Sequence, residues 1–238
     1  MSRSISVAIV DSGVNVPHPH LPGVAGGLAL DLEGRTSQDY VDRLGHGTAA
    51  AAAIYEKAPH AELWAVKVFD RELATTVATL VRAIDWASER GVRLVNLSLG
   101  TPNDFRAPEL EPAVARAVTR GTLVVSAFEH EGMRWYPGCM PGALGVVMDP
   151  RQARERVSVV TIGGEAVLCA SPYPRQIPGL PPERNLNGIS FAVANATGAL
   201  AAELEKHPEV RAAAEAIAMM TASPIGGAPL ELRDSGAT

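Results

Sequence analysis

A chain of 238 residues with 47% hydrophobic and 20% charged residues has the composition of a folded globular protein. Its length fits one large α/β domain better than two small ones. The formal charge of −5 without a basic patch argues against nucleic-acid binding, and no apolar run approaches the roughly 20 residues that span a bilayer. We therefore expect no nucleic-acid partner and no membrane association.

The first strand-like segment follows Met1 almost at once. Residues 5–10 are rich in β-branched side chains, and no charged-then-apolar signal segment precedes them. If Met1 is the natural start, we expect a protein made without a propeptide and retained in the cytoplasm. The two cysteines, Cys139 and Cys169, are then expected to be free thiols.

Six short segments have the continuous apolar character of strands buried on both faces of a parallel sheet. They are residues 5–10, 63–68, 94–99, 122–127, 144–148 and 157–162. Helical patterns occupy residues 47–58, 76–90, 111–120, 191–206 and 208–221. This alternation predicts a doubly wound, mostly parallel α/β sheet with helices on both faces.

No internal repeat or break in composition marks a second domain. Residues 1–222 are expected to form a single domain, and residues 223–238 a weakly ordered C-terminal tail. Residues 71–76 have the character of a loop, and so do residues 173–188, which contain four prolines and no periodicity.

Three short motifs stand where side chains should face the carboxyl edge of the sheet, the usual ligand site of open α/β sheets. Asp11 follows the first strand in the sequence D-S-G, His46 opens an alanine-rich helix in G-H-G-T, and Ser190 opens a later helix in N-G-I-S-F-A. Taken singly, each is explained as a strand end, a satisfied histidine or a helix N-cap. A serine nucleophile, however, needs an imidazole base that a buried carboxylate orients. Together they predict a catalytic triad.

The order Asp, His, Ser in these contexts resembles the subtilisin (subtilase) family of serine peptidases. The resemblance extends from about Val7 to about Ala222, although the proline usual shortly after the nucleophile is absent. It implies a subtilisin-like fold, and it implies that Ser98, Leu99 and Gly100 bind the substrate backbone as an added strand.

Two features make this chain more compact than the family it resembles. The glycine-rich substrate loop is reduced to residues 70–75, and no acidic loop with calcium-ligand spacing is evident. His18 and His20 suggest a metal site but lack a third ligand. We therefore expect neither a metal nor a cofactor.

One departure concerns the asparagine that stabilises the oxyanion in the family. Alignment on Glu131 and Gly132 places His130 at that position. An imidazole N–H can donate a hydrogen bond, so His130 is counted with the catalytic residues. The alternative is an impaired site.

The sequence therefore predicts a serine endopeptidase that acts on peptide or protein substrates, as a narrow-specificity intracellular processing enzyme. Two alternatives stay open. One is an impaired subtilisin-like protein that binds or scaffolds peptides, and the other is an enzyme that joins peptides rather than hydrolysing them. Nothing in the sequence indicates an oligomeric state.

Overall fold

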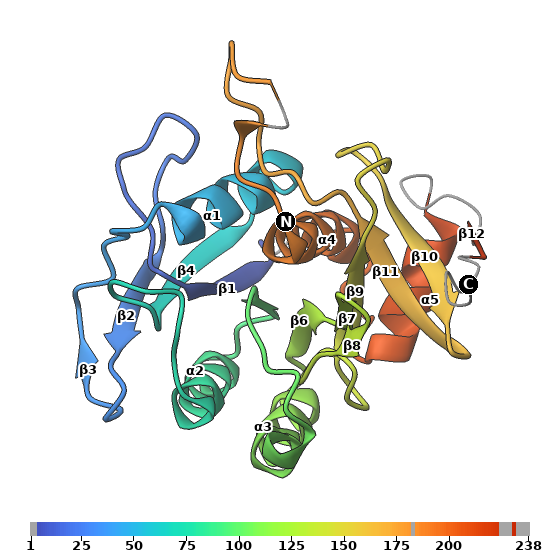
Figure 1. The fold of residues 1–238 in the computed structure, drawn as a ribbon, viewed down its shortest axis with the longest axis horizontal. Coiled ribbons are helices and arrows are strands. Elements are labelled where there is room, and N and C mark those ends of the chain that lie inside the picture. Colours follow the sequence, from blue (N-terminus) through green and yellow to red (C-terminus); the bar gives the residue numbers. More distant parts are fainter. Residues whose placement is uncertain (1–3, 182–183, 224–229, 232–238) are drawn as a thin grey trace.

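A twisted sheet runs through the middle of the molecule, with helices on both of its faces (Figure 1). The structure, a computed structural model, describes residues 4–181, 184–223 and 230–231. In this part of the chain the main sheet has ten strands, in the order β12-β10-β11-β9-β6-β5-β1-β4-β2-β3. The strands are β1 Ser6–Asp11, β2 Gly26–Leu30, β3 Thr36–Ser37, β4 Glu62–Lys67, β5 Leu94–Leu97, β6 Leu123–Ala127, β9 Leu144–Met148, β10 Val157–Ile162, β11 Glu165–Ala170 and β12 Leu230–Glu231.

Most neighbouring strands in this sheet are parallel, as the sequence predicts. The antiparallel pairs are β10 with β11 and β2 with β3. All six predicted strands are present, with ends within two residues of the expected bounds. The prediction missed β2, β3, β11 and β12, and it missed a separate short hairpin of β7 (Glu129–His130) and β8 (Met133–Arg134).

The helices divide between the two faces of the sheet. One face carries α1 (His46–Lys57), α4 (Ile189–Leu204) and α5 (Ala213–Ala222), and the other carries α2 (Val77–Glu89) and α3 (Ala107–Thr119). Strand β1 shows how the sequence supports both layers. Its Val7 and Ile9 join the apolar cluster of α1 and α4, whereas Ala8 and Val10 join that of α2 and α3. The predicted α/β fold class is confirmed.

Two helix boundaries differ from the prediction. Helix α3 begins four residues earlier, directly after the 3₁₀ turn η1 (Asp104–Arg106). Helix α5 begins at Ala213 rather than at residue 208, because the Glu215 carboxylate accepts hydrogen bonds from the backbone N–H groups of Arg211 and Ala212. The charge and geometry of this cap fix the helix start there.

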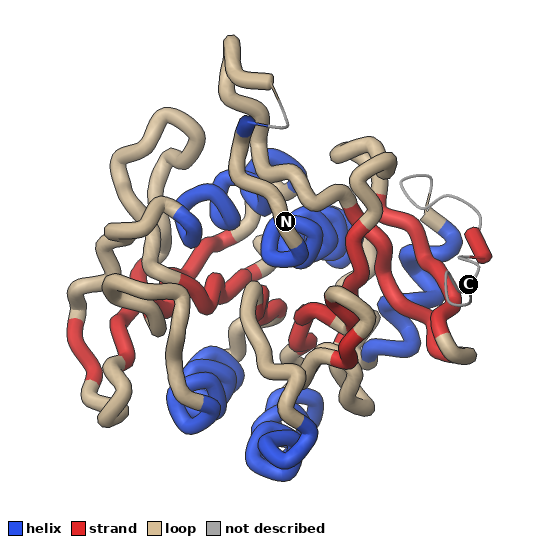
Figure 2. The backbone as a smooth tube through the Cα atoms, viewed as in Figure 1, coloured by secondary structure: helices blue, strands red, loops and turns tan. Residues whose placement is uncertain are grey.

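Long irregular segments connect these elements in places. Between β11 and α4, the described residues 171–181 and 184–188 are mostly irregular and are drawn mainly in tan in Figure 2. Of the predicted C-terminal tail, Leu230–Glu231 forms β12 and pairs in parallel with β10, while residues 224–229 and 232–238 lie outside the described residues. No helix within the described ranges is both long enough and apolar enough to cross a membrane.

Candidate active site

The predicted site residues lie at one edge of the sheet. Strands β4, β1, β5 and β6 are consecutive parallel neighbours, so their carboxyl ends meet at the same edge. Asp11 is the last residue of β1 and Ser98 follows β5. Helices α1 and α4 begin at this edge too, because His46 contacts Asp11 and Ser190 contacts Ser98.

Asp11 and His46 form a close pair. The His46 Nδ1 atom lies 2.7 Å from Oδ1 and 2.9 Å from Oδ2 of Asp11, whose side chain is fully buried. The backbone N–H of Ser12 also donates to Oδ1, at 2.7 Å. A carboxylate in this position holds the proton of His46 on Nδ1 and leaves Nε2 as an acceptor.

Opposing effects act on the protonation of His46. Burial lowers the pKa of His46, but the hydrogen bond and the charge of Asp11, together with the charge of Asp42, outweigh it. The net result is a pKa above the ordinary value of 6.5. The surroundings therefore favour an imidazolium, the species that a general base becomes after taking a proton.

Ser190 is the second residue of α4. Its hydroxyl donates a 2.9 Å hydrogen bond to the carbonyl oxygen of Ser98. The next residue, Phe191, places its ring centroid 5.0 Å from that of His46. Ser190 and His46 are thus brought to the same edge, but among the hydrogen bonds of the described residues the Ser190 hydroxyl points to Ser98 rather than to His46.

Sequence reasoning missed a second carboxylate, Asp42, which organises the start of α1. Its buried side chain accepts from the Ser12 hydroxyl at 2.8 Å, from the Leu44 and Gly45 N–H groups at 2.9 and 2.8 Å, and from the Thr48 N–H and hydroxyl at 2.9 and 2.6 Å. Burial raises the pKa of Asp42, but these hydrogen bonds outweigh it and hold the pKa below its ordinary value. The signal in the sequence was an acid shortly before a helix start.

The Ser12 hydroxyl connects this carboxylate to the backbone beside His46. It donates to Asp42 and accepts from the N–H of Gly47, at 2.9 Å. Gly47 itself passes so close that a Cβ atom would stand 2.2 Å from the Gly13 carbonyl oxygen and 3.1 Å from the Cβ of Asp11. The glycine after His46 is therefore required by the contact between α1 and the end of β1.

The loop that contains Ser98, whose carbonyl accepts the Ser190 hydroxyl, is held in place by a chain of hydrogen bonds. Asn96 donates from Nδ2 to the Ser98 hydroxyl at 2.7 Å, and the Thr197 hydroxyl of α4 donates to the Asn96 Oδ1 at 3.0 Å. Asn96 and Thr197 are fully buried. A polar chain thus links α4 to the loop after β5, and fixes Ser98 against Ser190.

The other two predicted substrate-binding residues lie beyond Ser98 in the same loop. The Ser126 hydroxyl donates to the Leu99 carbonyl at 3.3 Å. After Gly100, Thr101 exchanges two backbone hydrogen bonds with Tyr136, at 3.0 and 2.9 Å. The structure therefore joins this loop to the segment that follows the β7–β8 hairpin.

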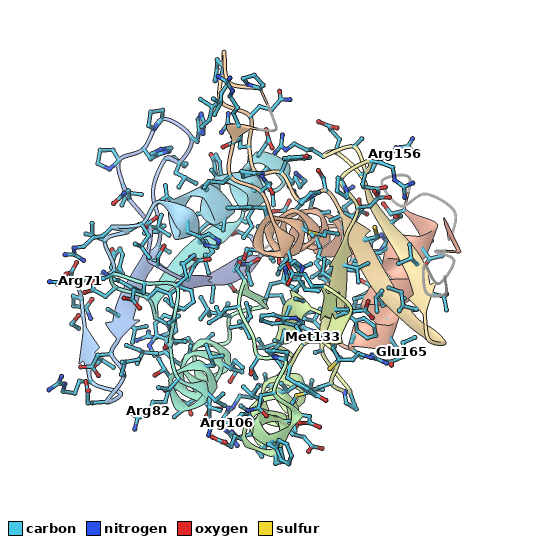
Figure 3. The ribbon with its side chains drawn as sticks, viewed as in Figure 1. Arg71, Arg82, Arg106, Met133, Arg156 and Glu165 are labelled. Carbon is cyan, nitrogen blue, oxygen red and sulfur yellow. The ribbon has the colours of Figure 1, made fainter. Side chains whose placement is uncertain are left out.

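His130 lies in that hairpin, and its side chain is 22% exposed. Its ring centroid is 6.1 Å from that of Trp135, and its Nε2 is 3.8 Å from a Glu131 carboxylate oxygen. No hydrogen bond joins it to Ser190 in the described chain. The hairpin is tied to the start of β11, since Arg134 donates to Glu165 at 2.7 Å; Met133 and Glu165 mark the two segments in Figure 3.

The remaining candidates lie apart from this constellation. His18 and His20 stack edge to face at 5.3 Å, and within the described residues no group of three or more histidine, cysteine or acidic side chains is placed to hold a metal ion. Cys139 and Cys169 are unpaired. Burial raises the pKa of both thiols, that of Cys169 to about 11, which makes them poor nucleophiles.

Comparison with known proteins gives the relatives of this chain. The sequence model of the Subtilase family (Peptidase_S8) matches residues 2–170, which include Asp11 and His46 and end before Ser190. Alkaline protease from Alkalihalobacillus alcalophilus is 32% identical over 216 residues, and subtilisin NAT from Bacillus subtilis subsp. natto is 31% identical over 230 residues. Each alignment covers 86% of this chain, but this chain spans only 55% and 56% of those two proteins.

A shorter relative resembles this chain in sequence, and two solved structures resemble it in fold. Subtilisin Savinase from Lederbergia lenta is 32% identical over 216 residues, which cover 86% of this chain and 77% of that protein. A cold-adapted subtilisin-like serine proteinase superposes with a TM-score of 0.68 at 18% identity, covering 90% of this chain and 80% of that one. Sphericase gives the same TM-score at 20% identity, covering 92% and 82%. The chain belongs to the subtilase family of serine peptidases.

Proposed function

We propose that this chain hydrolyses peptide bonds as a serine endopeptidase, with Ser190 as nucleophile, His46 as general base and then acid, and Asp11 as the group that orients His46. The observation that carries the proposal is the pair of short contacts between the buried Asp11 carboxylate and His46 Nδ1. A carboxylate so placed supports both the tautomer and the positive charge that the base needs.

For attack, the Ser190 hydroxyl turns from the Ser98 carbonyl toward His46 Nε2. The serine side chain has one rotatable bond that moves its hydroxyl between staggered positions, and catalytic hydrogen bonds are often absent before substrate binds. His46 takes the proton as the oxygen attacks the scissile carbonyl. It then returns the proton to the leaving amine, and water repeats the sequence on the acyl-enzyme.

The oxyanion forms beside the start of α4. The first N–H groups of a helix lack partners inside the helix, and its dipole favours negative charge there, so the Ser190 N–H is a suitable donor. His130 supplies the second donor in our proposal. Its support is its partial exposure in the hairpin that follows β6, together with its alignment to the family's asparagine.

The substrate backbone lies along Ser98, Leu99 and Gly100 as an added strand. We further propose that the substrates are few and intracellular. The support for few substrates is the short segment of residues 70–75 between β4 and α2, where the family carries a longer substrate loop. Slow digestion of casein with clean cutting of a single peptide encoded beside this gene is the expected result, and rapid general digestion of casein would contradict it.

The test of the catalytic proposal is labelling with a small fluorophosphonate, which reacts with activated serines. We expect the wild-type protein to be labelled at Ser190, and Ser190→Ala and His46→Ala to remain unlabelled. Labelling that persists in Ser190→Ala would exclude Ser190 as the nucleophile.

A second candidate function is peptide binding without hydrolysis. The observation that favours it is the hydrogen bond from the Ser190 hydroxyl to Ser98, which directs the nucleophile away from its base. A wild-type protein that stays unlabelled while it binds peptides would support this candidate against the endopeptidase.

A further inference from the structure

Trp135 lies between the β7–β8 hairpin, which carries His130, and the loop of residues 98–100. Its backbone N–H donates to the Phe128 carbonyl at 3.0 Å, which folds the chain back across the end of β6. On one side its ring centroid is 6.1 Å from that of His130. On the other side, its Cε3 atom is 3.3 Å from the point where a Cβ on Gly100 would stand.

The indole is on the same side of the sheet as the nucleophile. Trp135 packs against the apolar cluster that contains Ala192 of α4, two residues after Ser190. The next residue, Tyr136, packs with the cluster on the opposite face and pairs through its backbone with Thr101. This alternation, which is ordinary for extended chain, directs the indole toward the face of the sheet that α4 covers.

The position of the indole has a consequence for the substrate. In the proposed mechanism the attacked carbonyl lies at Ser190, its oxygen faces His130, and the peptide backbone runs along residues 98–100. The side chain of the residue that provides this carbonyl then enters between residues 98–100 and residues 128–130. The Trp135 ring lies between His130 and Gly100, one from each of these segments.

We infer that Trp135 is a specificity-determining residue, which restricts the substrate residue on the carbonyl side of the cleaved bond to glycine, alanine or serine. The inference rests on the proposed function and names its substrate class. A larger side chain there would have to displace an indole held by packing on two sides, and interiors resist added volume.

The ring is held without a hydrogen bond. Within the described residues, the Trp135 Nε1 atom is buried and has no partner. Removing the indole therefore leaves no other donor or acceptor unpaired, so a truncated variant tests volume alone.

The experiment compares tetrapeptide p-nitroanilides that differ only in the last residue: glycine, alanine, serine, leucine or phenylalanine. We expect the wild-type kcat/KM for alanine to exceed that for phenylalanine by about tenfold or more, the usual discrimination of a pocket by volume. In Trp135→Ala the preference should reverse toward leucine and phenylalanine. Trp135→Leu gives an intermediate ratio, and it replaces the alanine variant if that variant does not fold.

Trp86→Ala is the matched control, because it removes an indole from α2 on the opposite face, where Trp86 packs with Arg90. Its substrate preference should equal that of the wild type. A wild-type preference for leucine or phenylalanine, or an equal ratio in wild type and Trp135→Ala, would overturn the inference.

Failure of the proposed function is measured separately. Fluorophosphonate labelling reports whether Ser190 is an activated nucleophile, and a small probe places no substrate side chain against Trp135. If labelling fails, the inference is tested by calorimetry on the Ser190→Ala protein, with tetrapeptides that end in alanine or phenylalanine. Binding of the alanine peptide about tenfold tighter supports it, and equal or reversed affinity overturns it.

Discussion

The Lys57 ammonium donates a 2.7 Å hydrogen bond to Oδ1 of Asn195, and so joins the last residue of α1 to the middle of α4. The amide of Asn195 is fully buried, and its Nδ2 donates to the carbonyls of Ser171 and Tyr173 at 2.8 and 2.9 Å. The helices that carry His46 and Ser190 are therefore connected through a buried charge.

This buried charge predicts a pH-dependent stability. Burial, helped by the charge of Arg154, lowers the pKa of Lys57 to about 8, from 10.5, against the opposing charges of Glu56 and Glu155. Between pH 8 and 10.5 the unfolded chain then binds more protons at this site than the folded protein. The free energy of unfolding of the wild type should rise over this window by up to about 3 kcal/mol relative to Lys57→Met.

Urea unfolding of both proteins at a series of pH values measures this difference. Lys206→Met, at a lysine whose side chain is 61% exposed, is the matched control. A constant difference between the wild type and Lys57→Met from pH 7 to 10.5 would contradict the prediction.

The Asp11–His46 pair predicts the pH dependence of activity. Because Asp11 is what raises the pKa of His46 against the effect of burial, Asp11→Asn should move the acid limb of kcat/KM to lower pH. The same change should reduce kcat by about 10⁴, since an amide no longer fixes the tautomer or stabilises the imidazolium. The measurement is kcat/KM from pH 5 to 9. The control is Asp85→Asn, at a carboxylate that pairs with Arg116 away from the site, and it should leave the acid limb and kcat unchanged. An acid limb that does not move in Asp11→Asn would refute the argument.

Substitution of Asp42 is expected to lower both the stability and the activity of the protein, although the proposed mechanism does not place Asp42 against the substrate. Asp42→Ala leaves the buried donors of Ser12 and Thr48 unpaired, at a cost of about 3 kcal/mol in the free energy of unfolding. The start of α1 should loosen, and kcat should fall more than KM rises because His46 is misplaced.

The contribution of Asp42 has a defined pH window. Its pKa is lowered in the folded protein, so its stabilisation is complete above the ordinary value of 3.8 and is lost as the pH falls through the lowered value. The unfolding free energies of the wild type and Asp42→Ala should therefore converge in acid. Asp39→Asn, at an exposed carboxylate paired with Arg43, serves as the control, and a gap of constant size down to strong acid would count against the prediction.

The six strands that were predicted could be found because both of their faces are largely buried, which gives continuous apolar runs. Strand β2 lacks that signal, since it opens with two glycines and Gly27 passes so near β4 that a Cβ would stand 2.2 Å from the Ala65 carbonyl. Strand β11 opens with exposed residues after the turn at Gly163 and Gly164, where both φ values are positive. That glycine pair was the available sign of a hairpin.

The residues of the site divide in a similar way. Asp11, His46 and Ser190 stand in short motifs at strand or helix ends, which a local pattern can identify. Asp42 was identifiable only in part, because its bonds to Leu44, Gly45 and Thr48 are local whereas its bond to Ser12 depends on the fold. Lys57 acts through a partner that only the fold brings near, and its bond to Asn195 spans 138 positions in the chain. No periodicity encodes a contact over that distance, so the role of Lys57 could not be predicted.

His130 gives the sharpest prediction about the chemistry itself. If its N–H stabilises the oxyanion, His130→Ala should lower kcat by about 10²–10³, the usual cost of one such donor, with KM and the melting temperature little changed. The fold should tolerate the change because the side chain is partly exposed and its ring contact is with Trp135, which Gly100 also approaches. His130→Asn restores an N–H donor and should recover much of the lost turnover, whereas Glu131→Ala, its neighbour in the turn, should stay at the wild-type rate. Equal kcat values in the wild type and His130→Ala would remove His130 from the mechanism and leave the Ser190 N–H as the oxyanion donor for which the structure offers support.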